Sequence, residues 1–128
     1  MEEYPGLKIV THHMGAMVPH FSERIKGFYM ARDMYPQAKF PSLARDPLEY
    51  FKEFYGDTVL NGSEHAFECG YKFFGPEQIV FATDYPFGPG KGETWVEGTL
   101  HQIQASDLPQ EEKDQILGGN LQRIIDRG

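Results

Sequence analysis

The sequence predicts an α/β fold with parallel strands. Three short segments, near residues 7–12, 57–60 and 79–83, are β-branched or fully apolar, and each is followed by a segment with helical periodicity. Parallel neighbours must be joined by a crossover, and that crossover is normally a helix. With 128 residues, 40% of them hydrophobic and 14% aromatic, the chain can build a packed core as a single domain over residues 1–128.

The first strand is expected over residues 7–12, where a β-branched run follows a Pro-Gly turn. The strand ends in His12 and His13. Adjacent residues on a strand point to opposite faces, so we expect at most one of these histidines to face a site. From Met17 to about Arg32 apolar residues recur at helical spacing, which predicts an amphipathic helix.

The second unit begins after residues 35–43, which carry two prolines and no clean period and are expected to form a loop. Asp46 is the expected N-cap of the next helix, because proline follows it and an acidic residue lies three positions on. The strand at 57–60 then precedes a helix whose apolar stripe runs from Phe67 to Phe74.

The third strand, residues 79–83, is fully apolar, as is typical of parallel strands covered on both faces. It leads directly to Asp84. A helix is expected around Trp95 to Gln104 and another near Pro109, and Asn120 is the expected cap of the final turn.

Composition excludes several functional classes. Twelve Lys and Arg against 19 Asp and Glu give a net charge of −7, which disfavours a nucleic acid partner. A single cysteine, Cys69, cannot form an internal disulfide, and the first residues do not resemble a secretory signal. No apolar run is long enough to cross a bilayer. We therefore expect a cytoplasmic protein with a small-molecule substrate and no membrane partner.

The candidate site residues follow strands, and both parallel barrels and open sheets bind ligands at the carboxyl ends of their strands. Asp84 needs a metal ion, a basic side chain or backbone N–H groups as a partner, and the last of these would make it a turn cap. A histidine at the end of the first strand could bind metal or transfer protons, or be a satisfied, half-buried imidazole. Cys69 as a nucleophile is a further alternative.

Four segments in order resemble the amidohydrolase-2 family, which is similar to aminocarboxymuconate-semialdehyde decarboxylase and the resorcylate decarboxylases. The resemblance implies that the chain is the C-terminal part, about the last three βα units, of a (β/α)8 TIM-type barrel rather than an open sheet. The matching segments are YPGLKIVTHHMGAMVP at 4–19, FYGDT at 54–58, GPEQIVFATDYPF at 75–87 and ILGGN at 116–120.

The resemblance also implies an activity. In this family the aspartate of the matching T-D-Y-P segment is a metal ligand, usually of zinc, so Asp84 inherits that role. His13, by its spacing from Pro19, inherits the role of proton transfer. A divalent ion that polarises a substrate oxygen and an imidazole that moves a proton form a coherent pair. The implied enzyme is a metal-dependent hydrolase or non-oxidative decarboxylase of a small carboxylated or ring-derived substrate, with a lean to decarboxylation.

The family pattern is incomplete in this chain. The H-x-H pair of the first barrel strand and the histidine of the fifth have no counterpart here. Catalytic zinc needs several protein ligands, so this chain alone is expected to bind metal weakly or not at all. A partial barrel also exposes apolar edges, which a missing N-terminal barrel half or self-association would cover. The alternative is a non-catalytic, oligomerising barrel remnant.

Overall fold

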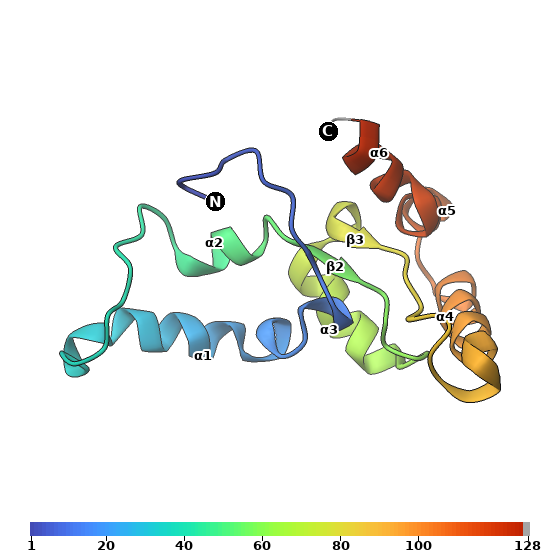
Figure 1. Cartoon of the computed structure of the whole chain (residues 1–128), viewed down its shortest axis with the longest axis horizontal. Helices are drawn as coiled ribbons and strands as arrows, with labels where there is room; N and C mark the ends of the chain where they lie inside the picture. Colours follow the sequence, from blue (N-terminus) through green and yellow to red (C-terminus); the bar gives the residue numbers. More distant parts are fainter. Residues whose placement is uncertain (127–128) are drawn as a thin grey trace.

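The computed structural model describes residues 1–126, and the three strands found there form one parallel sheet in the order β1-β2-β3 (Figure 1). Strand β1, Val10–Thr11, pairs with β2, Tyr55–Asp57, and β2 pairs in turn with β3, Ile79–Val80. Helices carry the chain from each strand to the next. The predicted α/β class with parallel pairing is therefore confirmed.

The strands are shorter than the predicted segments, and the middle one lies earlier than residues 57–60. The N–H of Thr58 still donates to the Val80 carbonyl of β3, at 3.1 Å, and the backbone then leaves the sheet at Val59, whose N–H donates to the Asp57 carboxylate at 3.1 Å. The N–H of Leu60 then closes a tight turn onto the Thr58 carbonyl, at 2.7 Å. Only residues 10–11 of the predicted range 7–12 form a strand, and only residues 79–80 of the predicted range 79–83 do so.

Helices begin and end close to where the apolar spacing predicts. The Asp46 carboxylate accepts from the N–H of Leu48 at 2.9 Å, which confirms the expected N-cap. Residues 35–43 form neither helix nor strand, as expected. The helices are α1 Val18–Met30, α2 Pro47–Phe51, α3 Glu64–Phe74, α4 Glu93–Ala105, α5 Gln110–Asp114 and α6 Asn120–Asp126, with a π-helical segment at Gln115–Gly119.

The sheet lies between two groups of helices (Figure 1). Helices α1 and α2 extend to one side of it, and α4, α5 and α6 lie on the other, with α3 packed beneath the strands. The core connects the sheet to α3 and to the C-terminal helices, and its buried members are Met14, Phe67, Phe74, Ile79, Ile103 and Ile116.

Asn120 is fully buried and does not cap the final turn, contrary to expectation. Its side-chain amide donates to the carbonyls of Pro76 and Ile79, both at 2.7 Å. The backbone N–H of Phe81 also donates to the Ile116 carbonyl, at 3.0 Å. The C-terminal helices are thereby attached to the segments before and after β3.

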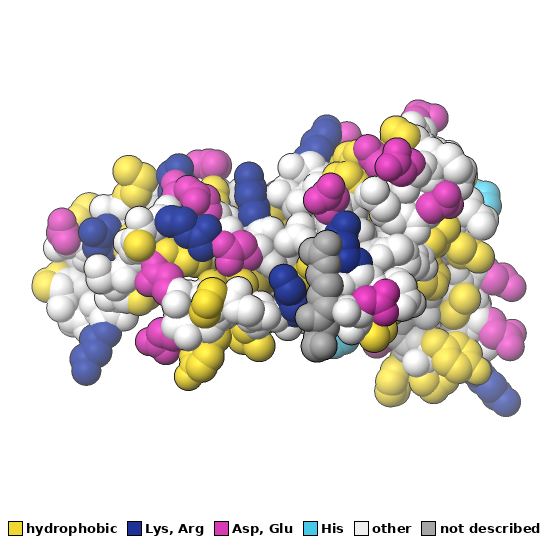
Figure 2. Space-filling view, turned by 90° about the horizontal axis from the view of Figure 1, so that it is seen from above, with side chains coloured by type: hydrophobic (Ala, Val, Ile, Leu, Met, Phe, Trp, Pro, Cys, Tyr) yellow, Lys and Arg dark blue, Asp and Glu magenta, His cyan; other side chains and the backbone are white. Residues whose placement is uncertain are grey.

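Apolar side chains remain on the surface at both ends of the molecule, interspersed with acidic and basic ones (Figure 2). Strand β1 is an edge strand of the described sheet, and its Val10 is 46% exposed, as expected of an incomplete barrel. Within residues 1–126, no helix is both long and apolar enough to cross a membrane.

Candidate active site at the carboxyl ends of the strands

Strand β1 leads into a left-handed turn at His13–Gly15. His13, Met14 and Ala16 have φ values of 54°, 52° and 52°, a conformation that side chains with a Cβ rarely adopt. The side chain of Met14 holds this turn in place, because it is 2% exposed and packs against Gly56 of β2 and Gly70 of α3. Burial of one methionine thus offsets local backbone strain.

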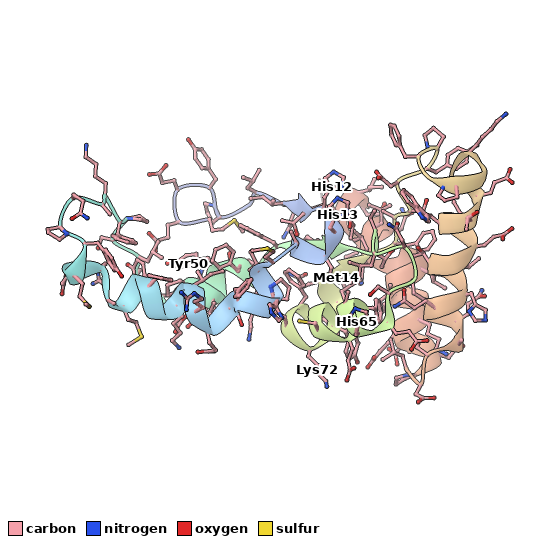
Figure 3. All side chains as sticks on the ribbon, turned by 90° about the horizontal axis from the view of Figure 1, so that it is seen from below. His12, His13, Met14, Tyr50, His65 and Lys72 are labelled. Atoms are coloured by element: carbon pink, nitrogen blue, oxygen red, sulfur yellow. The ribbon has the colours of Figure 1, made fainter. Side chains whose placement is uncertain are left out.

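His12 contacts the last residue of β2, and His13 contacts the segment that follows it. Nδ1 of His12 lies 3.0 Å from Oδ2 of Asp57, and Nδ1 of His13 lies 3.0 Å from the carbonyl oxygen of Val59. Their ring centroids are 5.9 Å apart, and Figure 3 shows the two residues next to each other beside Met14. The expectation that they point to opposite faces is wrong, because the chain leaves the strand conformation at His13.

Asp57 belongs to this arrangement, and the sequence analysis did not single it out. Its side chain is 3% exposed. Oδ1 accepts from the backbone N–H groups of Met14, at 3.4 Å, and Val59, at 3.1 Å, while Oδ2 faces His12. The pattern that selected Asp84, a carboxylate at the end of a strand, would also have selected Asp57, which is the last residue of the buried strand β2.

Asp84 follows β3 at the same end of the sheet and is exposed. Thr58 aligns the chain that leads to it, because its Oγ1 donates to the Ala82 carbonyl at 2.8 Å and accepts from the Ala82 N–H at 2.9 Å. The Asp84 backbone has a φ of 64°, and its carbonyl accepts from the N–H of Phe87. Its carboxylate forms no hydrogen bond or ion pair with another described residue, so the turn-cap alternative is not what the structure shows.

An exposed carboxylate suits a divalent ion as one ligand among several. No group of three or more His, Cys, Asp or Glu side chains within residues 1–126 is placed to hold a metal. Residues 1–126 therefore do not form a metal centre by themselves, and the role of Asp84 as a metal ligand stays a prediction.

A cavity of about 250 Å³ lies beside the histidine turn and is lined by residues of α1 and α3, with His13, His20, His65 and Cys69 among them. Cys69 is partly buried, and no base among residues 1–126 forms a hydrogen bond with its thiol. Nucleophilic activation of Cys69 thus has no structural support in this part of the molecule.

Sequence comparison connects these features to known proteins. A sequence model of the amidohydrolase family matches residues 1–127. The chain is 26% identical to 6-methylsalicylic acid decarboxylase of Penicillium expansum and 28% identical to gamma-resorcylate decarboxylase of a Polaromonas species. It is covered to 99% and 97% in these alignments, but it spans only 37% and 36% of the two relatives.

Solved structures of decarboxylases are also similar to this chain. The chain is similar to 5-carboxyvanillate decarboxylase of Sphingomonas paucimobilis, with a TM-score of 0.79 and 30% identity over 98% of this chain and 35% of that one. It is also similar to a dihydroxybenzoic acid decarboxylase of a Polaromonas species with bound manganese and 2-nitroresorcinol, with a TM-score of 0.77 and 25% identity over 98% and 35%. These neighbours are TIM-barrel enzymes, so the expected C-terminal portion of a (β/α)8 barrel is confirmed.

Proposed function

Because the chain belongs to the amidohydrolase family, we propose that it forms the C-terminal third of a metal-dependent decarboxylase of an aromatic carboxylic acid. The observation that carries this proposal is the parallel sheet, which brings His13 and Asp84 to the end of the strands where barrel enzymes act. Decarboxylation is favoured over hydrolysis because both curated relatives named above are decarboxylases.

Asp84 is the proposed metal ligand. Its carboxylate is exposed and has no hydrogen-bonding partner among the described residues, so both oxygens are free for coordination. A divalent ion bound there would neutralise and orient anionic oxygens of the substrate. Zinc is the metal that the family resemblance implies, whereas the Polaromonas structure contains manganese, so experiments should include both ions.

His13 is the proposed proton donor. A carbonyl oxygen can only accept, so the contact with Val59 places the hydrogen on Nδ1 and leaves Nε2 to exchange a proton with substrate. In the reaction, the bond between the ring carbon and the carboxylate breaks and carbon dioxide leaves. The electron pair left on the ring carbon takes a proton from Nε2 of His13 in its imidazolium form, in which both ring nitrogens carry a hydrogen, and His13 is left as the Nδ1–H imidazole.

The remaining metal ligands are proposed to come from the N-terminal part of the barrel. A single carboxylate does not make a metal centre, and the relatives are nearly three times as long as this chain. The exposed outer edge of β1 at Val10 is the place where a further strand would pair. Self-association is the other means of covering this edge.

A second candidate is a non-catalytic barrel remnant, which the lack of a three-residue metal group in residues 1–126 favours. Calorimetric titration of manganese and of zinc into the protein expressed from its complete gene separates the two. A decarboxylase should bind the metal ion, and Asp84→Asn should weaken or abolish this binding. The matched control Asp107→Asn, an exposed aspartate beyond α4, should bind as wild type does. A remnant predicts no binding, and no effect of Asp84→Asn beyond local stability.

A further inference from the structure

A carboxylate–imidazole pair lies next to the proposed proton donor and takes no part in the mechanism above. Asp57 is buried at the end of β2, and its Oδ2 lies 3.0 Å from Nδ1 of His12. The imidazole itself is open to solvent, with a side chain 79% exposed. All five histidines of the chain lie in the described part of the structure, and of these only His12 pairs with a carboxylate.

The hydrogen bonds of Asp57 determine which nitrogen of His12 carries the hydrogen. Oδ1 already accepts from two backbone N–H groups, those of Met14 and Val59. Oδ2 then acts as the acceptor for His12, so the shared hydrogen lies on Nδ1 and the lone pair lies on Nε2. A carboxylate on Nδ1 is also how catalytic histidines are held in one tautomer and one orientation.

We propose that Asp57 is a positioning residue that holds His12 as a second proton-exchanging imidazole beside His13. This inference rests on the proposed decarboxylase function, in which each turnover consumes one proton at the ring carbon. His13 gives that proton from Nε2 and must regain one. His12 first takes a proton from bulk solvent at Nε2, which makes it an imidazolium, and then passes this proton through an intervening water to His13, since the two ring centroids are 5.9 Å apart. His12 thereby returns to its Nδ1–H form.

The position of His12 supports this role over a purely structural one. The carboxylate is buried, whereas the imidazole is exposed and can exchange protons with bulk solvent. The other exposed histidines pair with no carboxylate in the described part of the chain, and His65 forms its hydrogen bond with the hydroxyl of Ser63, at 3.2 Å. Asp57 also closes the turn that presents His13, through its bond to the N–H of Met14.

Nitrogen-15 NMR of the histidine rings in the wild-type chain tests the first part of the inference. His12 should be held as the Nδ1–H tautomer, while exposed His101 should show the mixture of an unrestrained imidazole. A His12 spectrum like that of His101 would overturn the assignment of Asp57 as its positioning residue. Because this measurement needs neither metal nor substrate, its failure is distinct from failure of the proposed decarboxylation.

Kinetics of the protein expressed from its complete gene test the second part. His12→Gln should lower kcat about tenfold or more and leave KM unchanged, as loss of a proton relay does. The matched control, His101→Gln on α4, should leave both unchanged. Equal kcat for wild type and His12→Gln would contradict the relay, even with the tautomer confirmed. Asp57→Asn should reproduce the kcat defect if it folds.

Discussion

Met14 occupies the space that a side chain at Gly70 would need: a Cβ at position 70 would lie 2.0 Å from Cγ of Met14. This close approach seats the histidine turn against α3. We expect Gly70→Ala to push Met14 out of the core and to lower the free energy of unfolding by about 1–3 kcal/mol. Chemical denaturation measures this effect, and His13 ring signals should shift with it.

The matched control for Gly70 is Gly27, a helical glycine of α1 whose added Cβ would meet no atom within 4 Å. Gly27→Ala should raise the free energy of unfolding by about 0.5–1 kcal/mol, since alanine has the higher helix propensity. If both substitutions had the same effect, contact with Met14 would not be what requires glycine at position 70.

Thr58 positions Asp84 through its two hydrogen bonds to Ala82. Thr58→Val keeps the shape of the side chain but leaves the N–H and carbonyl of Ala82 without this partner, so we expect a loss of about 1–3 kcal/mol in unfolding free energy. Manganese binding that depends on Asp84 should weaken as well. Thr58→Ser retains Oγ and should preserve binding; if Thr58→Val also preserved it, the alignment of Asp84 by Thr58 would be disproved.

Asn120 joins α6 to the residues around β3. Asn120→Ala removes the amide that serves two buried carbonyls and should cost about 1–3 kcal/mol of unfolding free energy. Asn120→Asp should cost at least as much, because a carboxylate cannot donate to those carbonyls. Gln122→Ala, on the exposed side of the same helix, should change little. Thermal unfolding of the three variants provides the comparison.

Acid pH should weaken the attachment of α2 to α1. A hydrogen bond from the Lys26 ammonium, at 2.5 Å, and then one from the Leu48 N–H hold the pKa of Asp46 below its usual value. A lowered folded-state pKa stabilises the fold above the unfolded-state pKa, and that contribution is lost as the pH falls through the folded value. Asp46→Asn should therefore flatten the decline of stability below about pH 4. Asp33→Asn, in the turn after α1, should leave that decline unchanged.

Local patterns predicted the helices and the parallel strands, because both depend on the spacing of neighbouring residues. The stripe from Phe67 to Phe74 and the Asp46 cap are local signals of this kind, and both are present in the structure. Asp84 and His13 could be selected as candidates because each follows a strand. Their roles remain proposals, since no group of three or more potential metal ligands is formed within the described residues.

The histidine turn could not be predicted, because residues far along the chain impose it. Left-handed φ values at His13 and Met14 are unfavourable in isolation. They are stabilised by Asp57, 43 positions from Met14, and by the gap that Gly70 leaves in α3. The role of Asn120 was misjudged for the same reason, since its partners at Pro76 and Ile79 are over 40 residues away.

Manganese-dependent release of carbon dioxide from 2,6-dihydroxybenzoate or a related phenolic acid tests the central claim most directly. The protein should be expressed from its complete gene, with any in-frame residues encoded ahead of Met1. We expect activity in the wild type, a loss of roughly 10²-fold or more in kcat for His13→Asn and Asp84→Asn, and no change for Asp107→Asn. Folded His13→Asn and Asp84→Asn variants that decarboxylate as fast as wild type in the presence of manganese would contradict the proposed active site.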